Sequence, residues 1–90
     1  PSGQPSDSLN PAPPYPATSR HLREAGRVVV RVLIGPDGQV LDVVLQRSSG
    51  FERLDQVSIE AVRGWRFDPA AYRGASETLW IQIPINFVMQ

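Results

Sequence analysis

Four residues carry side chains that a nucleophilic site would need: His21, Ser48, Ser49 and Asp55. A serine nucleophile requires a histidine as general base and a carboxylate that orients the histidine. The sequence supplies these residue types, but it shows nothing that resembles a nucleophile elbow or an oxyanion loop. Catalytic sites are defined by several converging groups, so we expect no enzymatic activity and predict that His21 lies on the surface.

Composition also argues against metal, cofactor and nucleic-acid sites. One histidine, no cysteine and scattered carboxylates leave too few ligands for a zinc site, so we expect no metal and no cofactor. The nine basic residues are all arginine and are balanced by nine acidic ones, which gives no electrostatic attraction to nucleic acid. Trp80, flanked by Arg27 and Arg31, is the only aromatic residue expected on the outer sheet face, and base stacking commonly uses aromatic pairs.

The first fourteen residues differ in composition from the rest of the chain. Residues 1–14 contain five prolines and a single large apolar residue, Leu9. Such a segment buries too little surface to offset the entropy of ordering, so we predict a flexible Pro-rich linker end. No apolar run in the chain approaches the length of a membrane helix. We expect a single folded domain over residues 15–90, cut from a longer protein.

The pattern after the linker predicts a short helix followed by a hairpin. Pro16 suits a first helical turn, so we predict a helix over Ala17 to Ala25 that Gly26 ends, with Leu22 and Ala25 facing inward. Alternating β-branched residues predict strands over Val28 to Ile34 and Val40 to Gln46. A turn with the sequence Gly-Pro-Asp-Gly joins them.

A second helix and a third strand complete the predicted α+β fold. Apolar residues at helical spacing predict an amphipathic helix over residues 52–64, with Ser49 and Glu52 as a capping box. Alternation predicts a third strand over Leu79 to Val88. The order is a short N-terminal helix and then ββαβ, with one helix on one face of a three-stranded antiparallel sheet. The residues expected on the core face of the strands are Val28, Val30, Val32, Ile34, Leu41, Val43, Leu45, Leu79, Ile81, Ile83, Ile85 and Phe87.

A proline inside the third strand predicts its place in the sheet. Pro84 has no N–H for a ladder bond, and prolines in sheets are found at edges, strand starts and bulges. We therefore expect an edge strand whose Pro84 points to the free side, with Ile83 and Ile85 bonded to the first strand. An edge with few charges often receives another strand, although a second copy of the chain or the Pro-rich tail would also cover it.

These features, taken in order, resemble the C-terminal domain of TonB-type energy transducers. The resemblance covers residues 15–88 and is carried by short motifs at characteristic places. They are Pro14-Tyr15-Pro16, Gly26-Arg27-Val28, Pro36-Asp37-Gly38, Ser48-Ser49-Gly50, Leu54-Asp55, the run from Ala61 to Pro69 that contains Trp65-Arg66-Phe67, and the strand from Ile81 to Phe87.

The resemblance implies a function in the cell envelope. Proteins of this kind are anchored in the inner membrane of Gram-negative bacteria, and a Pro-rich segment crosses the periplasm. Their C-terminal domain binds the N-terminal box peptide of outer-membrane transporters by β-augmentation. Energy from an inner-membrane proton-driven motor complex, reached through the missing N-terminal part, then drives uptake of siderophores, haem or cobalamin. The alternative is a structural envelope module similar to the TolA C-terminal domain, which is not coupled to transport.

The resemblance also implies which residues contact the peptide, and it leaves open a homodimer formed through the same edge. The Tyr-Pro region is expected to contribute, although Thr18 stands where some relatives carry an arginine, with Arg20 nearby. The expected peptide-binding residues are Pro13, Pro14, Tyr15, Pro16, Arg20, Trp80, Gln82, Pro84, Asn86 and Val88.

Overall fold

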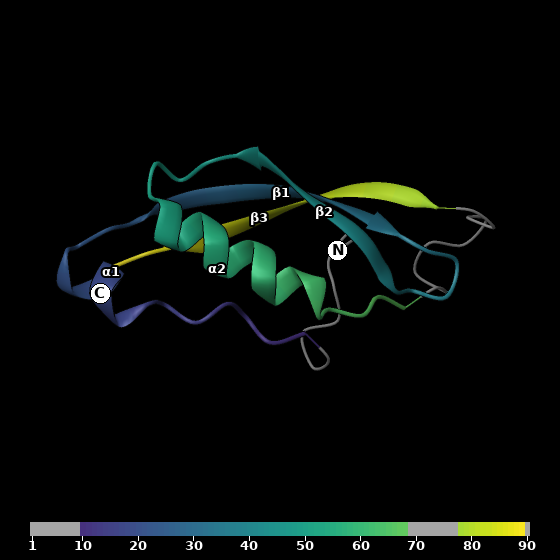
Figure 1. Ribbon diagram of the computed structural model, residues 1–90, viewed down its shortest axis with the longest axis horizontal. Coiled ribbons are helices and arrows are strands. Elements are labelled where there is room, and N and C mark those ends of the chain that lie inside the picture. The colour runs from purple at the N-terminus through teal and green to yellow at the C-terminus, as the bar shows by residue number, and fades with distance from the viewer. Residues whose placement is uncertain (1–9, 69–77, 90) are drawn as a thin grey trace.

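The computed structural model describes residues 10–68 and 78–89, which form one α+β layer pair (Figure 1). Its elements are α1 (Ala17–His21), β1 (Gly26–Ile34), β2 (Val40–Arg47), α2 (Glu52–Arg63) and β3 (Leu79–Phe87). The three strands make an antiparallel sheet of order β2-β1-β3, and α2 packs on one face of it. The predicted fold class, helix order and strand order are confirmed. In this part of the chain no helix has the length and apolar character needed to span a membrane.

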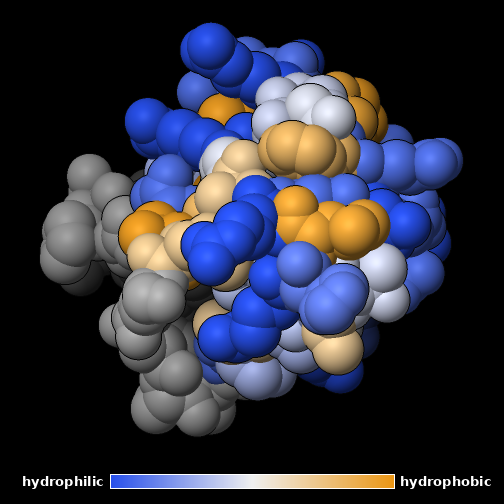
Figure 2. All heavy atoms as spheres, turned by 90° about the vertical axis from the view of Figure 1, so that its left-hand side faces the viewer, coloured by the Kyte–Doolittle hydropathy of each residue, from blue (hydrophilic) through white to orange (hydrophobic). Residues whose placement is uncertain are grey.

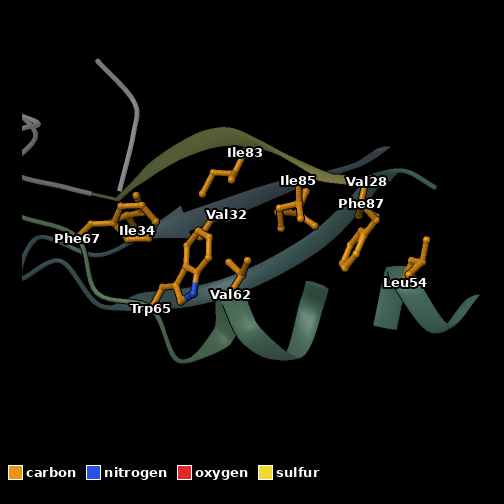
Figure 3. Close-up of a cluster of buried hydrophobic side chains, with 11 residues drawn as sticks. Val28, Val32, Ile34, Leu54, Val62, Trp65, Phe67, Ile83, Ile85 and Phe87 are labelled. Atoms are coloured by element: carbon orange, nitrogen blue, oxygen red, sulfur yellow. The ribbon is translucent and has the colours of Figure 1, made fainter. Parts of the chain in front are cut away.

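The core lies between α2 and the sheet (Figure 3). Val28, Val30 and Val32 are fully buried because every second residue of β1 points toward the helix. From α2, Leu54 and Val62 point toward the strands, and both are fully buried. Alternation in β3 is equally regular, and the buried residues there are Ile83, Ile85 and Phe87.

Two residues follow the second helix and close the core at one end of the sheet. Trp65 is 6% exposed and Phe67 is 3% exposed, and their rings lie 6.4 Å apart between centroids. The N–H of Phe67 donates to the carbonyl of Gly38 at 2.9 Å, which ties this segment to the β1–β2 turn. The two aromatic residues therefore anchor this end of the core.

The core face of β2 differs from the predicted one. The register of β1 against β2 shifts twice, so that Leu41 is passed over between the pairs Leu33–Asp42 and Ile34–Val40. A bulge of this kind breaks strict alternation, and Leu41 is 53% exposed. Leu45 lies opposite Val30 on the helix side but remains 38% exposed, because β2 has a neighbouring strand on one side only. The prediction for Leu41 is therefore wrong, whereas Leu45 lies on the predicted face of the sheet but is not buried.

The first helix is shorter than predicted. It ends at His21, and Arg23 then takes a left-handed conformation with φ of 59°. The N–H of Glu24 returns to the carbonyl of Ser19 at 2.8 Å, which closes the helix end. Leu22 therefore lies outside the helix and is 55% exposed, so its predicted inward position is wrong.

Gly26 does not end α1 but opens β1, where it lies against the loop before α2. A Cβ at this position would stand 2.9 Å from the carbonyl oxygen of Ser49, closer than real Cβ contacts come. Gly26 is therefore required by the close approach of two backbone segments.

The loop before α2 is held by a carboxylate and not by the predicted capping box. Phe51 is the N-cap residue, and no side-chain cap bond is formed. Instead, the Asp55 carboxylate accepts a bond from the Ser48 hydroxyl, and from the Ser49 hydroxyl at 2.8 Å and backbone N–H at 2.9 Å. Three of the four side chains considered for a nucleophilic site thus hold this loop together by hydrogen bonds.

Candidate functional site

The main candidate site is the free edge of β3, which is the side of the strand that pairs with no other strand of residues 10–68 and 78–89. Nine consecutive residue pairs join β3 to β1, from Gly26–Phe87 to Ile34–Leu79, without a register shift. Pro84 lies opposite Val29 and has no N–H, so its backbone faces away from β1. Backbone direction alternates along a strand, and therefore Gln82 and Asn86 also present their N–H and C=O groups to the free side. The edge position predicted from Pro84 is confirmed.

The two edges of the sheet differ in how they are protected. The edge strand β2 carries Asp42 and Arg47 and two register shifts against β1, which are common devices against unwanted pairing. The edge strand β3 has no charged residue and no shift. Of the two, β3 is therefore the edge suited to receive a further strand.

The side chains predicted for this edge are exposed. Trp80 is 40% exposed and Val88 67%, and Gln82, Pro84 and Asn86 between them are also exposed. Their side chains point to the sheet face opposite α2, because the intervening residues of β3 enter the core. A strand added here would therefore extend both faces of the sheet, the one opposite α2 and the one that covers the core.

The segment before α1 packs against the domain and is held by a side chain that the sequence did not single out. Asn10 is 6% exposed, and its side-chain amide donates to the Arg66 carbonyl and accepts from the Arg66 N–H, each at 2.8 Å. The Trp65 indole N–H donates to the Pro11 carbonyl at 2.9 Å. Contacts with the folded domain thus begin upstream of Tyr15, within the segment expected to be linker; residues 1–9 lie outside the described residues. Nothing in the local sequence distinguishes Asn10 from an ordinary linker residue.

Replacing Asn10 with alanine is expected to lower the free energy of unfolding by about 1–2 kcal/mol, because the N–H and C=O groups of Arg66 both lose their part-buried bond to this side chain. Urea unfolding followed by circular dichroism measures this effect. Pro14→Ala is the matched control, since Pro14 lies in the same segment and is exposed. If the two variants agree to within ~0.5 kcal/mol, the Asn10 contact contributes little.

Tyr15 joins this segment to the C-terminal end of β3. Its ring meets Phe87 edge-on at 5.3 Å between centroids, and its hydroxyl donates to the Glu24 carbonyl and lies 3.0 Å from Met89 Sδ. The Arg20 guanidinium lies over the Tyr15 ring, 4.8 Å from its centroid. The structure therefore brings the Tyr-Pro region and β3 together at one end of the edge.

The remaining predicted residues divide between this end and the opposite one. Pro13 and Pro16 are half-buried, and Pro14 is exposed. Trp80 lies opposite Leu33, at the other end of β3, about 23 Å from Phe87 by strand geometry. The predicted residues thus follow the length of the edge and do not converge on one point.

The surface at the Tyr15 end is mixed in character. Figure 2 shows this end, where α1 and the C-terminus lie, with hydrophobic side chains in small groups among hydrophilic ones. Leu22 and Val88 are the most exposed large hydrophobic residues of the described chain. A shallow groove of about 500 Å³ lies between Pro16 and α2.

The residues considered for a nucleophilic site do not all come together in the described part of the chain. His21 is exposed on α1, as predicted, and it is not among the bonded partners of Ser48, Ser49 or Asp55. Within residues 10–68 and 78–89 no three ligand-type side chains gather in a way that could hold a metal ion.

Comparison with known proteins assigns the chain to a described family. Residues 11–89 match the family model described as the C-terminal part of the Gram-negative bacterial TonB protein. The protein named tonB2 of Pseudomonas aeruginosa is 40% identical over 78 residues, which cover 87% of this chain and 29% of that protein. The TonB protein of Neisseria gonorrhoeae is 42% identical over 77 residues, covering 86% and 25%. The chain thus spans between 25% and 29% of the length of these relatives.

Solved structures show the same fold. The TonB C-terminal domain of Helicobacter pylori, determined by NMR in solution, superposes with a TM-score of 0.65 at 24% identity over 87% of this chain and 70% of that one. A second structure of that domain gives a TM-score of 0.63 at 26% identity, covering 90% and 82%.

Proposed function

The chain belongs to the family of Gram-negative TonB C-terminal domains, and from this membership we propose that it is the receptor-binding part of an energy transducer. In this proposal the domain binds the N-terminal box peptide of an outer-membrane transporter. The family match favours this function over the structural envelope module, which the sequence alone left open.

The free edge of β3 is the observation that carries the proposal. Every second residue from Trp80 to Asn86 offers backbone groups to the open side, and only Pro84 lacks a donor there. An extended peptide that adds to such an edge gains main-chain hydrogen bonds over its whole length, while its alternate side chains meet the two faces of the sheet. Affinity then depends little on peptide sequence, and specificity depends on the flanking side chains.

The Tyr-Pro region supplies a second contact in this proposal. Tyr15 packs on Phe87, and Arg20 lies over the Tyr15 ring. Tyr15 and Arg20 therefore lie at the C-terminal end of β3, beside one end of the bound peptide. The half-buried Pro13 and Pro16 hold the neighbouring backbone in an extended form. The peptide would therefore run between the outer side of β3 and this segment.

The wider assignment rests on the family. We infer that the domain faces the periplasm and that residues preceding it lead to an inner-membrane anchor and a proton-driven motor complex. Transport of siderophores, haem or cobalamin would be the process powered. The domain itself would act as a non-enzymatic adaptor that grips the transporter and transmits force.

A titration followed by NMR tests the proposal. Amide spectra of the isotope-labelled domain are recorded while a transporter box peptide is added. We expect shifts clustered on residues 80–88 and 13–20, with the β2 amides unaffected. Shifts centred on β2, or none with box peptides from several transporters, would contradict the proposal. Because a second copy of the chain could occupy the same edge, the titration is repeated at several protein concentrations.

A further inference from the structure

The sheet face opposite α2 carries an uneven distribution of charge. Residues paired across neighbouring strands point to the same face of a sheet. Val29, Arg31 and Leu33 point away from α2, so their partners in β2 and β3 lie on this face too. The members of this outer face are Arg27, Val29, Arg31, Leu33, Asp42, Val44, Arg47, Trp80, Gln82, Pro84 and Asn86. Three arginines thus stand against one aspartate, although the whole chain has a formal net charge of zero.

The helix layer has the opposite balance of charge, with three acidic and two basic side chains in α2. Glu52, Asp55 and Glu60 belong to α2, which covers the opposite face. Within residues 10–68 and 78–89 the structure places one ion pair, Arg53 to Glu24 at 2.8 Å, and it also involves α2. The outer face is therefore a positively charged surface, and it adjoins the free edge of β3.

Arg31 extends this charge from the central strand to the edge strand. Its guanidinium lies over the ring of Trp80, 4.9 Å from the centroid, although its backbone pairs with Gln82. A cation held over an indole ring stays charged and keeps its N–H donors at the rim of the ring. A strand that paired with β3 would lie about 4.8 Å from β3 on its free side. Its side chains would then be within reach of the Arg31 guanidinium.

We propose that the outer face selects for acidic character in the strand that pairs with β3, with Arg31 as the specificity-determining residue. This inference rests on the proposed function and names the chemistry of the partner: an extended peptide with Asp or Glu on the side that faces Trp80 and Gln82. Arg27 lies opposite Asn86, near the other end of β3, and adds to the positive electrostatic potential along the edge. A basic residue at the same peptide positions is disfavoured.

A charge scan of the peptide tests this. A single glutamate or glutamine is placed at successive positions of a transporter box peptide, and calorimetry gives the Kd at 50 mM and 500 mM salt. We expect glutamate to bind about two- to five-fold more tightly than glutamine at alternate positions, since exposed ion pairs are of this strength. At high salt the difference should shrink, because the charges are exposed to screening.

Variants of the domain assign the effect to one side chain. Arg31→Gln should abolish the preference for glutamate, and Arg31→Lys should retain part of it. Arg63→Gln is the matched control, because it removes the same charge from an exposed residue at the end of α2. Tight binding without a glutamate preference, or a preference equally reduced by Arg63→Gln, overturns the inference and leaves the proposed function standing. Absence of binding by every peptide overturns both.

Discussion

Replacing Trp65 with alanine is expected to lower the free energy of unfolding by about 3–5 kcal/mol, which is a large part of the stability of so small a domain. Trp65 is 6% exposed, and it fills the core beside Val62 and Phe67. Its indole N–H also holds the Pro11 carbonyl, so the substitution removes a core side chain and a contact to the N-terminal segment together. Denaturant unfolding followed by circular dichroism measures the loss.

The second tryptophan provides the matched comparison. Trp80 is 40% exposed on the outer face, and the Arg31 guanidinium lies over its ring. We expect Trp80→Ala to cost about 1–2 kcal/mol, because the ring lies on the surface and its removal leaves no enclosed cavity. Equal losses in the two variants would show that Trp65 is not the core anchor described above.

Replacing Asn86 with proline is expected to weaken binding of the box peptide about tenfold or more while the domain stays folded. The backbone of Asn86 faces the free edge, as that of Pro84 does two residues earlier, so proline removes a donor that β1 does not use. The bound peptide loses one main-chain hydrogen bond, and the carbonyl that accepted it is left unpaired. A tenfold rise in Kd corresponds to a loss of about 1.4 kcal/mol in binding free energy. Calorimetric titration gives the change in Kd.

The same substitution one residue earlier should act on the fold instead. Ile85 lies opposite Val28, and its N–H points toward β1. Ile85→Pro removes a ladder bond and a side chain that is 9% exposed, so we expect a loss of about 3 kcal/mol or more in stability. If Asn86→Pro unfolds the domain as readily as Ile85→Pro, the assigned direction of the β3 backbone is wrong.

Much of the fold follows from alternation and from one proline. Regular spacing of β-branched residues gave the buried side of β1 and β3, and Pro84 placed β3 at the edge because a missing N–H has few permitted positions in a sheet. The helix over Glu52–Arg63 followed from its apolar spacing. These signals are local in sequence and are therefore visible without the structure.

The errors arise where tertiary contacts decide local structure. The exposure of Leu41 results from a bulge in β2, and a bulge leaves no mark on the apolar pattern of one strand. The early end of α1 results from a bond between Glu24 and Ser19 after a left-handed Arg23, a residue type that rarely adopts this conformation. The predicted capping box does not form, and the Asp55 carboxylate instead accepts three hydrogen bonds from Ser48 and Ser49.

The candidate site was predictable in part. Pro84 and the family motifs pointed to the β3 edge, and the structure places Tyr15 and Arg20 at one end of that edge. The anchoring of Asn10 on Arg66, across more than half the chain, was not predictable, because no spacing rule links residues so far apart. The stacking of Arg31 on Trp80 required the register of three strands.

Amide hydrogen exchange with and without a box peptide tests the central claim most directly. If the peptide adds as a strand to β3, the edge-facing amides of Gln82, Asn86 and Val88 gain protection. Those of Ile83 and Ile85 change little, because they already bond to β1. This period-two pattern is the result that we predict. Uniform protection along β3, or new protection confined to β2, would show that the peptide does not pair with the free edge of β3.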